Sequence, residues 1–154
     1  MKLIQLTQGQ FVMVDDDMFE DLNQHNWCAH WYHNCFRAVR NVKIDGKWIT
    51  LLMYRAILNA KKGETIDHID NNPLNNQRSN LRFCSPSQNQ HNSKVRSDNK
   101  TGYKGVCTHG KSFRAKIYFN GKVIYLGTRS TPEEAYELYK EASKKYHGDF
   151  GRVE

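Results

Sequence analysis

The sequence has no long hydrophobic run. None of its apolar stretches approaches the ~18 residues that a membrane-spanning helix needs. Its first residues, Met1–Leu6, also lack the extended apolar segment of a secretory signal. These absences argue against a membrane span, and we expect a soluble, cytoplasmic protein without a membrane partner.

Cysteine is scarce as well. The four cysteines, at positions 28, 35, 84 and 107, form no Cys-x-x-Cys pair. Structural zinc usually takes its thiolates from such pairs, so no structural zinc is expected. Disulfides are not expected in a reducing compartment either, and we therefore predict free, mostly packed thiols.

Acidic residues are nearly missing from one part of the chain. Residues 91–127 contain eight lysines and arginines but only Asp98 as an acid, whereas residues 1–66 carry eight basic and seven acidic side chains. The formal net charge of +7 therefore arises in one window. Charge concentrated in this way indicates a polyanionic partner. Charge alone leaves a second interpretation open, a merely solvated basic face.

Composition divides the chain into two parts. The N-terminal third is rich in strand-forming and aromatic residues, with Asp45-Gly46 as a tight hairpin turn. Asp15-Asp16-Asp17 precedes a short helix, and capping of that helix is favoured over a metal site. Residues 91–101 are polar, basic and without periodicity, which is typical of a linker. The predicted boundaries are 1–92 for the first domain, 93–101 for a basic linker and 102–154 for the second domain.

The C-terminal part has the pattern of a small sheet with one helix. Asn120-Gly121 is a hairpin turn signal, and Thr131–Glu134 combines a capping box with proline at the first helical position. Alternation along 113–119 gives the sheet an apolar face that can pack on the helix and a basic, aromatic face that cannot be core. An exposed sheet of this chemistry fits the major groove of DNA. The residues predicted on the exposed face are Arg114, Lys116, Tyr118, Val123 and Tyr125.

Asp67-His68 is followed by Asn80 and Asn89 in an asparagine-rich stretch. Alone, Asp67-His68 also suits a polar turn with a structural histidine. Phosphodiester hydrolysis needs an activated water, and a histidine of pKa ~6.5 can activate one near pH 7. The oxygens of Asp67 and Asn89 are hard ligands that favour Mg²⁺ or Mn²⁺. The chain would bring these residues together by folding back as a strand at 64–69, a loop at 70–79, a strand at 80–84 and a helix opened by Ser85–Gln88.

This stretch resembles the HNH nucleases and their ββα-metal fold. The match runs through Asp67-His68, Ser79–Arg82 and Ser87–Asn89, within about 64–92. The implied roles are general base for His68, ligands of one divalent metal ion for Asp67 and Asn89, and pinning of the loop that orients the base for Asn80.

The resemblance and the C-terminal pattern together predict the fold class, and one position departs from the family pattern. We expect an α+β protein in which N-terminal antiparallel strands lead into a ββα-metal nuclease core, followed by a small three-stranded antiparallel sheet packed on one helix. Met53-Tyr54-Arg55 stands where the family often has Leu-His-Arg. The role of Tyr54 is therefore left open.

The last fifty or so residues resemble the plant ethylene-response-factor (Apetala-type) DNA-binding domain, which lays its sheet in the major groove. The match runs from Gly102–Val106 through Tyr125–Thr128 to Gly148–Phe150. Cys107 and Val123 stand where that family has arginines, so the recognised DNA sequence cannot be copied from it. By position, the implied DNA contacts are Lys104, His109, Arg114, Lys116, Tyr118 and Tyr125.

Together, the two resemblances predict a homing-type, metal-dependent DNA endonuclease that uses one Mg²⁺ or Mn²⁺ ion. One active site per chain predicts nicking of double-stranded DNA by a monomer, whereas cleavage of both strands would require a dimer or two visits. If the protein is phage-encoded, it would act in the host cell cytoplasm. Arg78 and Arg82 are candidate phosphate contacts, with surface solvation as the alternative. The rival hypothesis is a non-catalytic, sequence-specific DNA-binding regulator that keeps the nuclease fold as a scaffold.

Overall fold

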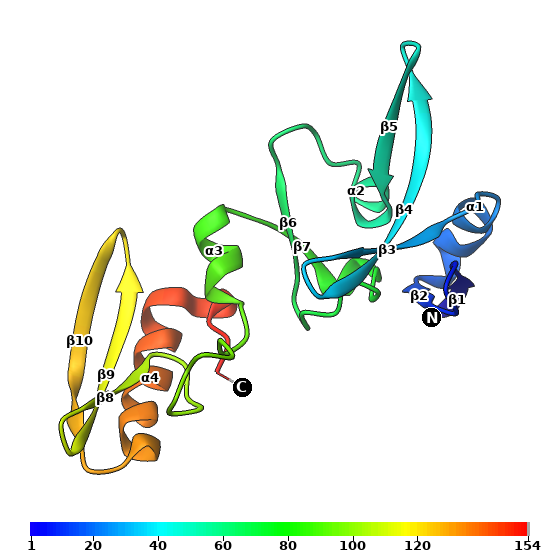
Figure 1. The fold of residues 1–154 in the computed structure, drawn as a ribbon. Coiled ribbons are helices and arrows are strands. Elements are labelled where there is room, and N and C mark those ends of the chain that lie inside the picture. Colours follow the sequence, from blue (N-terminus) through cyan, green and yellow to red (C-terminus); the bar gives the residue numbers. More distant parts are fainter. Residues whose placement is uncertain (154) are drawn as a thin grey trace. The chain divides into compact units, whose positions relative to one another are not determined.

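The chain folds as two compact units, Met1–Pro86 and Ser87–Glu154, in a computed structural model that describes residues 1–153. Figure 1 shows the helices and strands of each unit. The division falls earlier than the predicted boundary after residue 92, because most of the helix that begins at Pro86 groups with the second unit.

Three small antiparallel sheets make up the first unit (Figure 1). The strands pair in the orders β1-β2, β3-β4-β5 and β6-β7. Their bounds are β1 Lys2–Gln5, β2 Phe11–Val14, β3 Cys28–Tyr32, β4 Cys35–Ile44, β5 Lys47–Leu52, β6 Thr65–His68 and β7 Leu81–Cys84. The short helices between them are η1 Asp16–Met18, α1 Phe19–Asn23, α2 Met53–Ile57 and η2 Arg78–Asn80.

The core of the first unit joins the β1–β2 hairpin to one face of the β3–β4–β5 sheet. Val12 and Val14 alternate along β2 and are fully buried. They pack with Ala29 and Ala38 from the larger sheet and with Met53 from α2. Apolar residues two apart on a strand share a face, so these short strands each bury one side.

The first unit confirms one predicted turn and corrects one predicted cap. Asp45 and Gly46 join β4 to β5 with positive φ angles of 49° and 77°, as the hairpin signal predicts. Asp15 occupies the N-cap position of η1, but its side chain makes no capping hydrogen bond. Its carboxylate accepts from the backbone and side chain of Arg78 instead.

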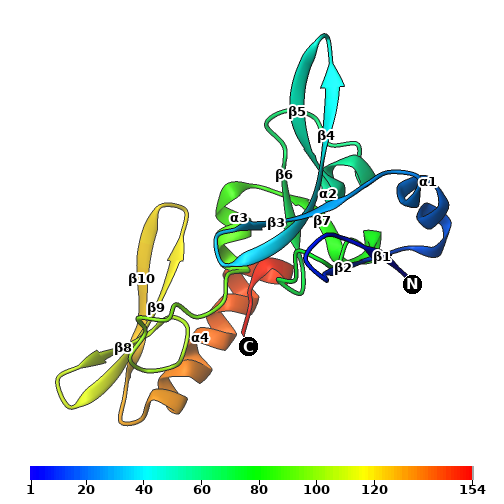
Figure 2. The ribbon, with the colours of Figure 1, turned by 45° about the vertical axis from the view of Figure 1, so that its right-hand side comes forward.

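The second unit has the predicted three-stranded antiparallel sheet and one long helix, which Figure 2 shows lying along the sheet. The strand order is β10-β9-β8. The elements are α3 Pro86–His91, β8 Val106–His109, β9 Ser112–Phe119, β10 Lys122–Arg129, α4 Pro132–His147 and η3 Gly148–Phe150.

Packing in the second unit follows the predicted alternation. Ala115 and Ile117 of β9 are buried against α4, where Ala135 and Tyr139 face them. Gly105 (φ 74°) allows a close approach, since a Cβ there would lie 2.0 Å from Cδ2 of Tyr139. The sheet and α4 therefore share one small core.

The predicted capping box begins α4. Thr131 Oγ1 accepts from Glu134 N at 3.3 Å, and Glu134 Oε2 accepts from Thr131 N at 3.4 Å. This confirms the helix start that Thr131–Glu134 predicts.

Three further features bear on the class of protein. The described part of the chain is α+β with small antiparallel sheets, while the packing of α3 against β6 and β7 stays a prediction. All four cysteines are free thiols. Among residues 1–153, no helix combines the length and hydrophobicity of a membrane span.

Candidate active site

The β6–β7 hairpin places Asp67 beside Arg82. The two residues are direct partners in the antiparallel register. Arg82 donates from Nε and Nη2 to Oδ2 of Asp67, at 2.9 Å and 2.7 Å. Asp67 is only 3% exposed, and a buried carboxylate is costly unless a positive partner compensates it. Arg82 was predicted as a phosphate contact, and the structure shows it compensating the charge of Asp67 within the hairpin.

His68 follows at the end of β6 and is held on two sides. Its Nε2 lies 2.9 Å from Oδ1 of Asn76, and the edge of the Tyr54 ring meets it with centroids 5.0 Å apart. An amide oxygen only accepts, so this orientation puts the proton on Nε2 and leaves a lone pair on Nδ1. Burial lowers the pKa of His68, with the bond to Asn76 acting in the opposite direction. The ring is therefore a neutral imidazole near pH 7.

Asn80 closes the loop between the two strands. Its Nδ2 donates to Oδ1 of Asp70 at 2.9 Å and to the carbonyl oxygen of Asn75 at 2.8 Å. Its Oδ1 accepts from the backbone N–H of Asp70 at 3.0 Å. Asn80 is 8% exposed, so these bonds offset the cost of burying an amide. The loop is thus fixed at both ends, next to the histidine.

The N-terminal hairpin holds the same loop from outside the motif. Met13 of β2 donates its backbone N–H to the carbonyl of Leu74 and accepts from the N–H of Asn76, both at 2.8 Å. Leu74 also packs on the core of the first unit. Asn76 is completely buried, and its Nδ2 has no hydrogen-bond partner among residues 1–153. The backbone bonds therefore fix the amide that meets His68.

Asn76 is the functional residue that the sequence interpretation missed. The sequence predicts only a loop at 70–79, and its asparagines suit turns without indicating a partner for the histidine. Leu74 is the one signal that could have identified it, since an apolar residue in a polar loop marks a docking point.

Arg78 lies at the start of η2 and bridges to the aspartates that precede α1. Its backbone N–H and Nε both meet Oδ2 of Asp15, at 2.9 Å and 3.0 Å. Its Nη2 donates to Oδ2 of Asp17 at 2.5 Å. Arg78 was predicted as a phosphate contact, and the structure shows it holding the loop to the N-terminal segment.

Asn89, the second predicted metal ligand, lies on α3 in the second unit. Lys104 donates to the carbonyl oxygens of His91 at 2.5 Å and Ser93 at 2.6 Å. The rings of His91 and His147 stack with centroids 3.6 Å apart. These contacts fasten the end of α3 to its own unit, and the pairing of Asn89 with Asp67 stays a prediction.

Lys104 was predicted as a DNA contact, but its ammonium group is engaged inside the second unit. Burial lowers its pKa to about 8, and the nearby charge of Arg152 acts in the same direction. A half-buried ammonium bound to two carbonyl oxygens is a structural clamp on α3.

Among residues 1–153, no group of three or more His, Cys, Asp and Glu side chains is placed to hold a metal ion. The predicted pair is of a different kind, since Asp67 and Asn89 offer one carboxylate and one amide. Both supply oxygen, the donor that Mg²⁺ and Mn²⁺ prefer. The donor chemistry therefore fits such an ion.

The other predicted DNA contacts gather on the outer face of the second sheet. Arg114 contacts Nε2 of His109 and lies over the ring of Tyr125, 5.4 Å from its centroid. Lys116 is exposed, and Tyr118 and Tyr125 are 51% and 65% exposed. The face is basic and aromatic, as the alternation predicts.

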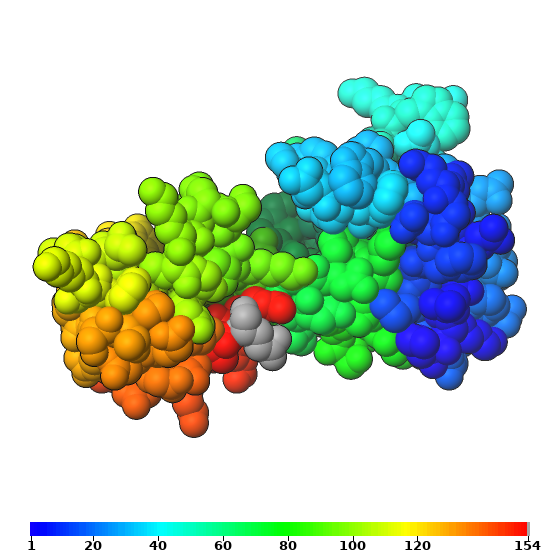
Figure 3. All heavy atoms as spheres, turned by 60° about the horizontal axis from the view of Figure 1, so that its bottom comes forward, coloured from blue at the N-terminus to red at the C-terminus, as the bar shows by residue number. Residues whose placement is uncertain are grey.

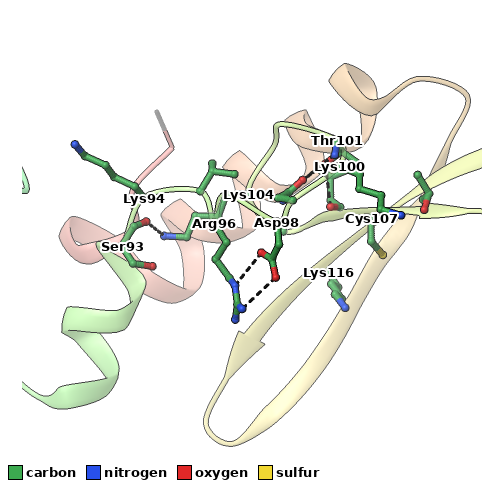
Figure 4. A pocket seen from close by; sticks show the side chains of 14 residues that line it. Ser93, Lys94, Arg96, Asp98, Lys100, Thr101, Lys104, Cys107 and Lys116 are labelled. Carbon is green, nitrogen blue, oxygen red and sulfur yellow. Dashed lines mark hydrogen bonds and ion pairs between the residues drawn. The ribbon is translucent and has the colours of Figure 1, made fainter. Parts of the chain in front are cut away.

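A pocket of about 540 Å³ borders this face (Figure 4). The segment predicted as a linker forms one wall, and Lys104, Gly105 and residues of β8 and β9 supply the rest. Its one acid, Asp98, accepts two bonds from Arg96, both at 3.1 Å. The basic residues that line the pocket are Lys94, Arg96, Lys100, Lys104 and Lys116.

Comparison with known proteins assigns the family. An HNH endonuclease family model matches residues 59–91, the stretch that contains β6, the closing loop and β7. The chain is 35% identical over 147 residues to an uncharacterized HNH endonuclease of Acanthamoeba polyphaga mimivirus, covering 93% of this chain and 74% of the relative. It is 34% identical over 93 residues to Protein 3.8 of Escherichia phage T7, covering 59% of this chain and 76% of that protein. No solved structure matches the chain. The chain therefore belongs to the HNH endonuclease family and is a nuclease.

Proposed function

We propose that this protein is a metal-dependent endonuclease that nicks double-stranded DNA, with His68 as its general base. The observation that carries the proposal is the setting of His68. Its Nε2 is held by a buried amide whose backbone is anchored to β2, and burial keeps the imidazole neutral. A fixed, neutral histidine is what proton abstraction from water requires.

The proton moves to the ring nitrogen opposite Asn76. With Nε2–H donating to Oδ1 of Asn76, the Nδ1 lone pair can accept a proton from the attacking water. The ring of Tyr54 limits rotation of the imidazole from the side. General bases of this kind contribute about 10²- to 10⁴-fold to rate.

Asp67 and Asn89 would hold the divalent ion, with Mg²⁺ or Mn²⁺ favoured by their oxygens. When bound, such an ion neutralises phosphate charge and stabilises the leaving 3′-oxygen. Arg82 fixes the carboxylate of Asp67 through two bonds to one oxygen. Asn80 and Asn76 keep the adjacent loop and the base in place.

The second unit would bind the DNA and so direct the nuclease, as in a homing-type enzyme. Ser87–Glu154 contains 13 basic and 7 acidic residues, while Met1–Pro86 contains 10 and 9. The surplus of positive charge coincides with the exposed sheet face and its bordering pocket. Phosphate contacts release counterions, so affinity should fall steeply with salt.

The rival hypothesis, a DNA-binding regulator that keeps the nuclease fold as a scaffold, disagrees with the family assignment. The ion pair of Asp67 with Arg82 does not distinguish the two functions, because a purely structural hairpin would also need it. The two functions differ in whether the phosphodiester bond is broken.

Supercoiled plasmid separates these functions. We expect the wild-type protein to nick plasmid with Mg²⁺ and not with EDTA, and His68→Ala to lower the nicking rate by about 10²-fold or more. The matched control is His25→Ala, which removes an exposed histidine of the same unit. Thermal unfolding and gel shift should show both variants folded and bound to DNA. Wild-type protein that shifts DNA but leaves it supercoiled overturns the nuclease, and equal nicking by His68→Ala rejects the base.

A further inference from the structure

The hairpin of β4 and β5 extends beyond the sheet to which it belongs. β3 pairs only with the Cys35–Val39 part of β4, so Arg40–Ile44 pairs with Lys47–Leu51 alone. Figures 1 and 2 show this two-stranded part, the β4–β5 ribbon, standing away from the rest of the first unit, and Figure 3 shows its tip in cyan. An isolated two-stranded hairpin is only marginally stable in water. Binding to a partner would therefore stabilise this ribbon.

The ribbon exposes large apolar side chains near its tip. Trp48 is 71% exposed, and Ile44 and Ile49 are 51% and 42% exposed. By the register, Trp48 lies on the face that carries Lys43, and Ile44 and Ile49 lie on the other face. Large apolar side chains exposed on both faces of a protruding ribbon suit an element that enters a groove of its partner.

One face of the β3–β4–β5 sheet continues from the ribbon as an open groove. Ala29 and Ala38 turn into the core, and the opposite face forms a hollow of about 660 Å³. Arg37 lies over the ring of Tyr32, 4.9 Å from its centroid, near the inner end. Val39 and Leu52 form an apolar floor of this hollow, and the other side chains that line it are mostly polar, cationic or aromatic, among them Cys28, His30, Tyr32, Arg37, Asn41 and Thr50.

Charge in the first unit is concentrated on this part of the sheet. Residues 28–52 carry four basic side chains and one acid, whereas the rest of Met1–Pro86 carries six basic and eight acidic ones. The near-neutral average of residues 1–66 conceals this difference. Arg37 lines the groove, and Lys43 and Lys47 extend the positive charge onto the ribbon. A local positive charge in an otherwise acidic unit is complementary to a polyanion.

The charge of one groove residue, Arg37, acts on the candidate general base and on its aromatic neighbour. The ring of Tyr54 contacts His68. Burial raises the pKa of Tyr54, and the charge of Arg37 opposes that effect. Burial lowers the pKa of His68, and the charge of Arg37 adds to that effect. A chain of neighbours therefore leads from His68 through Tyr54 to Arg37 and onto the open face.

We propose that the open face of β3–β4–β5 and the β4–β5 ribbon bind the DNA duplex next to the phosphate that is attacked by the water activated by His68. This inference rests on the proposed nuclease function. A two-stranded ribbon fits the major groove, where apolar side chains contact thymine methyl groups and lysines reach the phosphates. Lys43 and Trp48 are paired in register near the tip, so one side of the ribbon offers both kinds of contact.

The test compares two double substitutions that remove the same charge from the first unit. Lys43→Gln with Lys47→Gln alters the ribbon, and Lys61→Gln with Lys62→Gln alters an exposed turn elsewhere. The probe is a DNA duplex around a nick site mapped on plasmid, with affinity followed by fluorescence anisotropy at several salt concentrations. We expect the ribbon pair to bind on the order of tenfold more weakly, with a salt slope smaller by about two, and the control pair to be nearly unchanged.

Trp48→Ala tests the apolar contact separately. It should weaken binding several-fold at an unchanged salt slope, because an apolar contact releases no counterions. Equal effects of the two lysine pairs, or an unchanged affinity of the ribbon pair and Trp48→Ala, would overturn the proposal. So would a ribbon variant that binds DNA normally but changes the oligomeric state in analytical ultracentrifugation, since the ribbon would then be a protein interface.

The binding test of the ribbon and the nicking test of His68 can fail independently of each other. If the wild-type protein nicks no DNA but the ribbon pair still weakens binding, the DNA surface stands and the catalytic role of His68 falls. If nicking by the wild type depends on His68 and the ribbon pair binds normally, the catalytic proposal stands and this surface falls.

Discussion

The candidate catalytic site and the predicted DNA-binding face hold their polar side chains in opposite ways. In the first, Asp67, Asn76 and Asn80 are all buried and make hydrogen bonds to neighbours in the same unit. In the second, Lys116 and Tyr125 stand on an open sheet face. A base must be held in one orientation, which a buried network provides, whereas DNA contacts must reach an extended ligand. The buried network therefore suits the candidate base, and the open face suits the predicted DNA contacts.

The comparison predicts its largest effect at Asn76, which should change the rate and not the binding. Asn76→Ala removes the bond to Nε2 of His68, so we expect the nicking rate at saturating DNA to fall about 10- to 100-fold. DNA affinity should stay unchanged. Gln77→Ala is the matched control, because Gln77 is the next residue in the chain and its side chain is outside this network. Single-turnover nicking and anisotropy measure the two quantities, and a variant that changes only affinity would break the division between the units.

A smaller effect is expected on the exposed face of the second sheet, where the pattern should be reversed. Arg114→Ala with Lys116→Ala should weaken DNA binding about tenfold and reduce the salt slope by about two, with the rate at saturating DNA preserved. Lys140→Ala with Lys144→Ala, on α4, provides a control with the same loss of charge. An unchanged slope in the Arg114 and Lys116 variant would place the DNA-binding face elsewhere.

The smallest effect concerns Lys104, which belongs to the second unit but clamps the helix that carries Asn89. Its pKa is about 8 in the folded chain against 10.5 for an ordinary lysine, so the unfolded state binds more protons between these values. The cost of burying the charged form is therefore relieved as pH rises from 8 to 10.5, while the amine can still donate to the two carbonyl oxygens. The free energy of unfolding of wild type, relative to Lys104→Met, should increase over that range.

Denaturant melts at pH 7.5 and pH 10 measure this difference, with Lys100→Met as an exposed control. A parallel pH dependence in Lys104→Met and wild type would mean that the ammonium is solvated. Lys104→Met should also slow nicking a few-fold without weakening DNA binding, which would sharpen the comparison by assigning one residue of the second unit to the chemistry.

Local patterns predicted much of this structure. Alternation and turn signals identified β9, β10 and α4, because each depends on neighbours within a few residues. The fold-back of β6 onto β7 was predicted in the same way, with the loop between them. The residues within each of these elements and its adjoining turns are thus sufficient to predict it.

The partners of the polar residues could not be predicted, because they are distant in sequence. Asn76 is fixed by Met13, and Arg78 pairs with Asp15, each across some sixty residues. Lys104 has the position of a DNA contact, yet it turns inward to the end of α3. Composition indicates that such residues prefer turns or surfaces, and only the packed chain determines which become buried.

The hydrogen bonds from Met13 have a consequence for protein engineering. The matched family segment, residues 59–91, contains the aspartate, the histidine and the loop asparagines, but not the strand that holds Asn76 under the imidazole. Grafted onto another scaffold, that segment would carry every residue of the motif and lack the support for its base. The smallest transplantable nuclease is therefore not the motif but the motif together with the opening hairpin of the chain.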